Sequence, residues 1–212
     1  TALKKQSKFD INVPVLSFST PDLTEIHKED AENAQFGQRY RFAIGTQVNI
    51  TPSNSGLWTT EANGDRVWRL KVKFPGAEAL SFMFSKFQLY GDSYINVFNR
   101  DGEKVHLTYT KNDVLDHGQQ NLSLCEGDFL MLELVEPAGT MSSVLEMDNV
   151  MYCYRGTGYK VNNEKDFGGS ESCEVNVNCS PEGNNWQDEK RGVARILVYL
   201  SGSGYWCSGS LI

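Results

Sequence analysis

The segment LWTTEANGDRVWRLKVKF, residues 57–74, contains the clearest fold signal in this sequence. Two runs rich in Thr, Val and Trp flank Asn63-Gly64, a dipeptide that favours the tight turn of a β-hairpin. Within residues 68–73 the even positions are apolar and the odd positions, beginning with Arg69, are basic. A period of two places one face against a core and the other in water. The segment therefore predicts a half-buried antiparallel hairpin, with Arg69 on the wet face.

Short alternating runs continue through residues 36–158 at a spacing of about ten residues, with turn signals such as Asn99-Arg100-Asp101-Gly102 between them. This spacing is typical of an all-β sandwich or jelly roll. Residues 36–158 are long enough to bury an independent core. We expect almost no helix there. The predicted core residues are Trp68, Leu70, Val72, Phe82, Phe84, Ile95, Val97, Leu130 and Leu132.

The segments on either side of this region are polar. Residues 1–35 predict an extended leader, with at most one short strand in the apolar run 13–18 and one weak helical turn. Residues 159–172 are polar and glycine-rich, which predicts an exposed linker of the kind that proteases cleave. We therefore expect a leader, a sandwich, a linker and a C-terminal piece at residues 173–212.

Composition excludes several functions. The formal net charge of −7 and the absence of a basic stripe argue against a nucleic-acid partner. No run approaches the roughly 18 apolar residues of a membrane span. The three histidines are isolated and the cysteine spacings do not fit zinc. Aspartates in turns could gather to bind calcium, but no calcium-loop motif is present. We predict no metal and no other cofactor.

Cysteines and a glycine/serine hairpin mark the C-terminal 45 residues, which run from Gly168 to Ile212. Gly168–Cys173 reads GGSESC, Cys179 follows, an apolar strand occupies Val193–Leu200, and Cys207–Ile212 reads CSGSLI. In this order, the motifs resemble the start of a secreted, trypsin-like serine protease of the bacterial lysyl endopeptidase kind. The resemblance implies that residues 173–212 are an incomplete trypsin-like β-barrel.

The sandwich region also resembles the upstream domain of such precursors. The similar segments are Gly56–Trp58, Trp68–Leu70, Phe82–Leu89, Gly127-Asp128 and Tyr154–Gly156. The resemblance implies a pro-region that assists folding, keeps the protease silent, or both. It also implies a secreted, periplasmic or cell-surface bacterial protein, a parent enzyme directed at Lys or Arg, and two kinds of partner: its own protease domain and its protein substrates.

The resemblance identifies candidate site residues. The family's mature chain would begin at Gly168, often after a basic residue. Here Phe167 stands there and Lys165 lies two residues earlier, which leaves self-processing after lysine open. The family's catalytic histidine would lie beyond Ile212. We therefore assign no catalytic residue, and we expect the chain itself not to hydrolyse peptides although it contains Ser208 and Ser210.

The resemblance places the partners of Cys173, Cys179 and Cys207 further along the protease. Cys125 and Cys153 each lie in or beside a predicted strand of the same sandwich, and we predict that they form a disulfide. Their loop is long enough for a bridge to contribute a few kcal/mol. Two buried thiols are the alternative.

An alternative function remains open from the sequence alone. Aromatic residues on a sandwich, such as Trp58, Tyr90 and Tyr94, would also suit a secreted carbohydrate- or protein-binding module. A strand containing a catalytic histidine soon after Ile212 would favour the protease, and its absence would favour the module.

Overall fold

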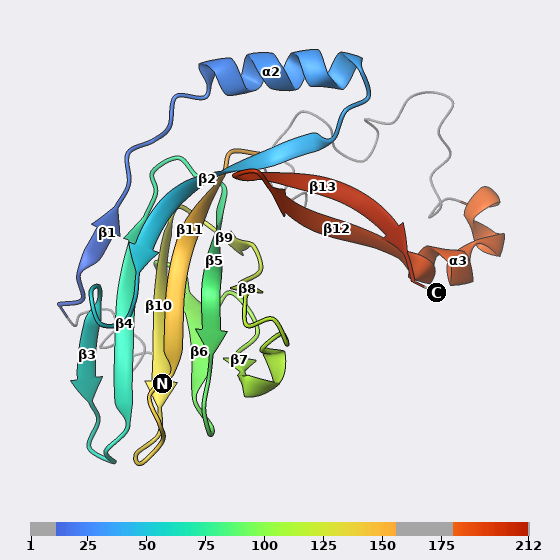
Figure 1. Ribbon diagram of the computed structural model, residues 1–212. Helices are drawn as coiled ribbons and strands as arrows, with labels where there is room; N and C mark the ends of the chain where they lie inside the picture. The colour runs from blue at the N-terminus through green and yellow to red at the C-terminus, as the bar shows by residue number, and fades with distance from the viewer. Residues whose placement is uncertain (1–11, 156–179, 212) are drawn as a thin grey trace. The chain divides into compact units, whose positions relative to one another are not determined.

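A computed structural model describes residues 12–155 and 180–211 of the chain (Figure 1). These described residues are mostly β, with 47% in strands and 14% in helices, so the predicted all-β class is confirmed. Two compact units are present. The described part of the first comprises residues 12–21 and 43–155, and that of the second comprises residues 22–42 and 180–211.

One sheet of the first unit has six strands, in the order β1-β4-β10-β6-β7, with β3 also pairing with β4. Neighbouring strands within this sheet are antiparallel, except that β1 and β4 are parallel. The strands are β1 (Val15–Ser17), β3 (Leu57–Thr60), β4 (Arg66–Lys73), β6 (Tyr94–Phe98), β7 (Tyr109–Thr110) and β10 (Phe129–Glu136).

The second sheet of this unit has β11 between β2 and β5, and β5 also pairs with two short strands, β8 and β9. A register shift between Met147 and Asn149 of β11 marks a bulge within this strand. The strands are β2 (Tyr40–Ile50), β5 (Ala79–Gln88), β8 (Gln120–Asn121), β9 (Cys125–Glu126) and β11 (Val144–Cys153).

The core of the first unit lies between these sheets. All nine predicted core residues are buried, including Trp68, Phe82 and Leu132. Within residues 43–155 the helical structure is one short 3-10 turn, η1 (Lys111–Asp113). The prediction of a helix-poor region with this core is confirmed, because strict alternation in the strands fixes which side chains face inward.

The β3–β4 hairpin forms as predicted. Trp58 is paired with Trp68, and the amide of Glu61 donates to the carbonyl of Asp65 at 2.8 Å across the loop. Gly64 has a φ of +88°, which is accessible to glycine at little steric cost. The Asn-Gly dipeptide therefore closes the hairpin for the expected reason.

The outer face of the six-stranded sheet differs from the prediction. Arg69 was expected in water, but it is only 2% exposed, and Glu133 of β10 is 1% exposed. The two residues are paired in register across β4 and β10. Arg69 and Glu133 form an ion pair, which offsets the cost of burying each charge. A charged residue in the sequence of one strand does not reveal that such a partner exists on another strand.

The described part of the leader, residues 12–35, is more ordered than predicted. Its strand β1 joins the sandwich by pairing with β4, and a twelve-residue helix α2 (Thr24–Gln35) replaces the weak helical turn. The guanidinium of Arg41 holds this helix, with its Nε 2.9 Å from the carboxylate of Asp30 and its Nη2 3.1 Å from the carbonyl of Ile26. This contact between sequence-distant residues explains a helix whose own composition is weak.

The described C-terminal part of the second unit consists of η2 (Glu182–Asn185), α3 (Gln187–Gly192), β12 (Val193–Leu200) and β13 (Ser203–Ser210). The predicted apolar strand has the same bounds as β12. β12 and β13 form an antiparallel hairpin closed by Ser201-Gly202, both with positive φ. A two-residue turn of this kind matches the twist of the flanking strands.

The predicted disulfide between Cys125 and Cys153 is absent, and both residues are free, buried thiols. Cys125 pairs with Leu80 on one side of β5, while Cys153 pairs with Ala79 on the other side. Two strand spacings amount to about 9.6 Å, whereas a disulfide needs Cα atoms within about 7 Å. The intervening strand therefore keeps the thiols apart.

Candidate functional site

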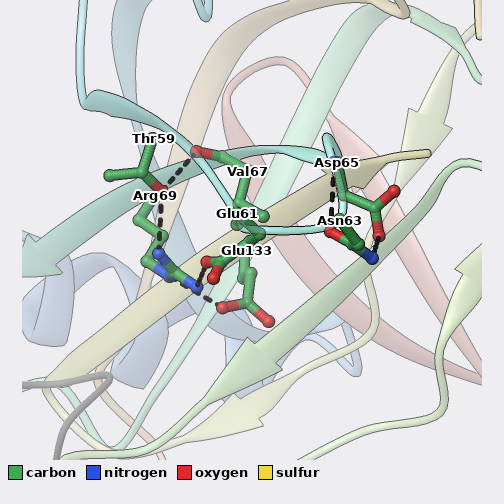
Figure 2. Close-up of polar contacts among 7 residues, drawn as sticks. All are labelled: Thr59, Glu61, Asn63, Asp65, Val67, Arg69 and Glu133. Carbon is green, nitrogen blue, oxygen red and sulfur yellow. Dashed lines mark hydrogen bonds and ion pairs between the residues drawn. The ribbon is translucent and has the colours of Figure 1, made fainter. Parts of the chain in front are cut away.

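The loop of the β3–β4 hairpin and the outer faces of β4, β6 and β10 line an open, charged pocket of about 430 Å³ in the first unit. We call it the acidic pocket. Figure 2 shows the polar contacts around it. Its lining residues are Glu61, Ala62, Asn63, Asp65, Val67, Arg69, Tyr94, Glu133 and Val135.

Arg69 is the centre of the polar contacts beside this pocket. Its Nε lies 2.7 Å from Oε2 of Glu133, and its Nη2 lies 3.5 Å from Oε1 of Glu61. Its Nη1 donates to the hydroxyl of Thr59 at 3.2 Å. The hydroxyl of Thr59 in turn donates to the carbonyl of Val67 (Figure 2). Each guanidinium nitrogen thus has an acceptor, as burial of this group requires.

The hairpin tip holds the third carboxylate of the pocket. Oδ2 of Asp65 accepts from the amide nitrogen of Asn63 at 2.7 Å, and Oδ1 accepts from the backbone of Ala138 at 3.0 Å. The backbone of Asp65 donates back to Oδ1 of Asn63 at 3.2 Å. These contacts fix the carboxylate at the rim and tie the tip to the loop after β10.

The pocket is electronegative. Three carboxylates against one guanidinium give a formal charge of −2. Burial raises the pKa of the Tyr94 phenol, and the carboxylates of Glu133 and Asp65 raise it further, so the hydroxyl is protonated at neutral pH. Among the described residues no group of three or more His, Cys, Asp or Glu side chains could hold a metal. The pocket suits an organic cation such as an ammonium group.

A second cavity, of about 320 Å³, lies beside Trp58 and the loop before β11. The guanidinium of Arg66 stacks over the Trp58 ring at 4.3 Å and lies 3.6 Å from the buried carboxylate of Glu136. The indole nitrogen of Trp58 donates to the carbonyl of Pro52 at 2.8 Å. One face of this aromatic ring is thus already covered by the chain itself.

The described residues with possible catalytic chemistry are dispersed. His106 stacks on Tyr109 with ring centroids 5.5 Å apart, and Nδ1 of His117 accepts from the amide of Gln119. Ser208 and Ser210 lie on β13, paired in register with Arg195 and Val193 of β12. Burial raises the pKa of the Cys125 thiol to about 12, which opposes a nucleophilic role. In these contacts the side chains pack against neighbouring residues or take part in turns.

Several sequence-predicted site residues lie outside the described residues. They are Lys165, Phe167 and Gly168 of the expected processing site, and Cys173 and Cys179. Cys207 lies on β13 as a free, half-buried thiol.

Sequence reasoning missed the acidic pocket. One signal was available: Glu133 stands inside the strongly apolar run FLMLELV. A carboxylate in such a run needs a buried partner. Identifying Arg69 as that partner requires knowing that β4 pairs with β10, which brings together two residues 64 positions apart in the sequence.

Comparison with known proteins relates the C-terminal segment to a protease family. Residues 167–212 match the family described as lysyl endopeptidase, C-terminal domain. The protein is therefore related to lysyl endopeptidases over this segment. The matched range leaves out residues 36–158, so the resemblance drawn for the sandwich remains untested.

Among solved structures, the chain is similar to the Arthrobacter globiformis T6 isomalto-dextranase complexed with panose. The identity is 10% and the TM-score 0.25, over 45% of this chain and 17% of that one. This chain thus spans less than a fifth of the length of that enzyme. A likeness of this size supports no conclusion about function. Within the described residues, no helix has the length and apolar character needed to cross a membrane.

Proposed function

We propose that the chain combines the pro-region of a secreted serine endopeptidase precursor with the leading strands of its protease domain. The observation that carries this proposal is the lysyl endopeptidase match at residues 167–212, which follows a sandwich with its own core. In this proposal the sandwich assists folding of the protease or holds it silent. Cleavage near Gly168 separates the two parts outside the cytoplasm.

The chemistry supports placing the catalytic machinery beyond residue 212. Acyl transfer needs a nucleophile, a base that takes its proton, and an oxyanion hole in fixed geometry. The serines of β13 belong to a segment without a histidine, because His117 is the last histidine in the sequence. Of the described histidines, His27 lies on α2, His106 stacks on Tyr109, and His117 accepts from the backbone of Gln119. The parent would supply the missing strands and cleave after Lys or Arg.

Expression of the precursor with its downstream sequence tests the proposal. We expect N-terminal sequencing of the processed product to begin at Gly168, and lysyl esterase activity to appear as that product accumulates. Cleavage after Phe167 by another protease leaves Gly168 as the first residue, whereas self-processing after Lys165 leaves Asp166. A Lys165→Gln variant would slow the second route and leave the first unchanged. A processed product without activity on lysyl or arginyl esters would contradict the protease function.

The chain of 212 residues provides the complementary measurement. We expect no turnover of lysyl or arginyl peptide esters by the purified chain. Turnover that survives both Ser208→Ala and Ser210→Ala would place a catalytic site elsewhere in the chain. Turnover abolished by either substitution would show that the residues before position 212 already form a working site.

A further inference from the structure

We propose that the outer edge of β3 binds an extended peptide as an added antiparallel strand, and that a glutamate side chain of this peptide enters the second cavity and bonds to Arg66. The ligand is thus a peptide segment with one acidic residue at a fixed position. This inference does not rest on the protease function, because every residue that carries it belongs to the first unit.

Strand β3 presents an unpaired edge. Within the described chain it pairs with β4 alone (Figure 1). Glu61 and Asp65, just beyond the strands, form a hydrogen-bonded pair, and opposite residues of an antiparallel ladder alternate between bonded and non-bonded pairs. Thr59 therefore bonds to β4, whereas the backbone N–H and C=O groups of Trp58 and Thr60 point away from it. These four groups match two residues of an added strand.

The sequence of β3 does not protect this edge. The strand reads LWTT, with no proline and no charged residue, the devices that commonly prevent an edge from accepting another strand. It is only four residues long, which limits the added ladder to the outward groups of Trp58 and Thr60. Few main-chain bonds are therefore available, and specific binding needs a side chain that is held beside the edge.

The second cavity provides a place for that side chain. Trp58 and Arg66 both line it, and Arg66 is paired with Thr60 across β3 and β4. Directly opposite residues of neighbouring strands share a face of the sheet. The residue of the added strand opposite Thr60 is then about 9.6 Å from Arg66, two strand spacings that a glutamate and an arginine close between them. The volume of about 320 Å³ suits a side chain more than a larger ligand.

Arg66 has unused hydrogen-bond donors at this cavity. Its Nη1 donates to Oγ of Ser142 at 3.0 Å and lies 3.6 Å from Oε2 of Glu136. Its Nε and Nη2 have no acceptor among the described residues. These two nitrogens form the edge of the guanidinium opposite Nη1, and their parallel N–H bonds fit the two oxygens of a carboxylate. The ring of Trp58, 4.3 Å from Cζ, supports the guanidinium.

A buried hydroxyl adds a third donor. Ser143 lines the cavity, and its Oγ is buried without a hydrogen-bond partner in the described part of the chain, a state that is uncommon in folded proteins. The nearby acids have cationic partners, since Glu136 lies 3.6 Å from Arg66 and Glu146 lies 2.8 Å from Lys86. Formal charges around the cavity therefore balance, and the unused donors, rather than a net charge, select a carboxylate.

An NMR titration of the full chain tests the proposal with the probe acetyl-Thr-Glu-Thr-Val-Thr-amide. When its glutamate lies opposite Thr60, its valine lies opposite Trp58. We expect the amide signals of Trp58 and Thr60 to shift, and their hydrogen exchange to slow, as the probe binds. A probe with glutamine in place of glutamate should bind about tenfold more weakly, because it loses the charge-assisted bonds to Arg66.

Two variants separate the edge from the cavity. Thr60→Pro removes an N–H that points away from β4, a position where an edge strand tolerates proline, so the hairpin should remain and probe binding should be lost. Arg66→Gln should abolish the preference for glutamate. Arg100→Gln is the matched control and should keep it. Arg100 also lies over an aromatic ring, Phe129, and beside a carboxylate, Asp128, but at the other end of β4.

Other outcomes would overturn the proposal. Amides of Trp58 and Thr60 that do not respond to millimolar probe, or binding that survives Thr60→Pro, would show that β3 does not accept a strand. Equal affinity for the two probes would exclude the carboxylate contact, and this wild-type comparison decides the point even if Arg66→Gln does not fold. Shifts of these amides that depend on protein concentration without any probe would identify a second copy as the occupant of the edge.

Discussion

Replacing Glu133 should lower the free energy of unfolding, because it leaves the charge of Arg69 buried without its main partner. In a Glu133→Leu variant, Arg69 keeps its hydrogen bond to Thr59 and its contact with Glu61, but it loses the acceptor at 2.7 Å. The Arg69 side chain is 3% exposed, so water does not replace that acceptor easily. Breaking a buried pair by removing one partner typically costs about 3–5 kcal/mol. We expect a loss in this range.

The second substitution recovers most of that loss. Arg69→Met in the Glu133→Leu background removes the stranded charge and fills similar volume with apolar atoms. Replacing both members of a buried pair by apolar residues is often nearly neutral. We therefore expect the free energy of unfolding of the double variant to lie within about 1 kcal/mol of the wild-type value. Such a recovery would mean that the two sites are strongly coupled.

Urea denaturation followed by tryptophan fluorescence measures all four corners of this double-mutant cycle. The matched control is Lys86–Glu146, whose 2.8 Å separation is almost the same but whose side chains are 63% and 41% exposed. A surface pair should couple by only about 0.2–1 kcal/mol. Equal coupling energies for the two pairs would refute the argument that burial sets the energy.

Two further predictions concern the thiols and the glycines of the sandwich. Cys125 and Cys153 should resist iodoacetamide at pH 8 until the chain unfolds, because burial raises the pKa of both thiols. The pKa of each thiol is higher in the folded chain than the ordinary thiol pKa. Protonation of these thiols therefore contributes its full stability below about pH 9, and this contribution falls as the pH rises toward 12. In urea titrations, a double Cys→Ala variant should lose less stability over this pH range. Gly56→Ala should cost several kcal/mol in the same assay, because its Cβ would lie 2.4 Å from Nε1 of Trp68. Gly118→Ala, with similar positive φ and open space, should cost only about 1–2 kcal/mol, and equal losses would show that crowding is unimportant.

Local patterns predicted the strands and the core well. The alternation in residues 68–72 identified the inward side chains of β4, and Asn63-Gly64 identified the turn before it. The bounds of Val193–Leu200 were also predicted correctly. In each case the signal lies within a few neighbouring residues, where the period of the strand or the chemistry of the turn decides the structure.

Features that depend on strand order were not predictable from these patterns. Cys125 and Cys153 suited a disulfide as strand residues of one domain, but β5 lies between them. Arg69 was predicted to face solvent, but the register of β10 places Glu133 opposite it. Both outcomes follow from the long-range arrangement of strands, which periodicity alone does not specify.

The two parts of the chain differ in how well they bury apolar residues. In the sandwich, Phe82 and Leu132 are fully buried, whereas Val193 of the C-terminal hairpin is 67% exposed and Leu211, just beyond the hairpin, is 71% exposed. The sandwich has the core of an independent domain, but a hairpin with such exposure has little core of its own. Exposed apolar strands also favour association. In the proposed precursor, the remaining strands of the protease domain cover this hairpin. The sandwich folds independently of those strands.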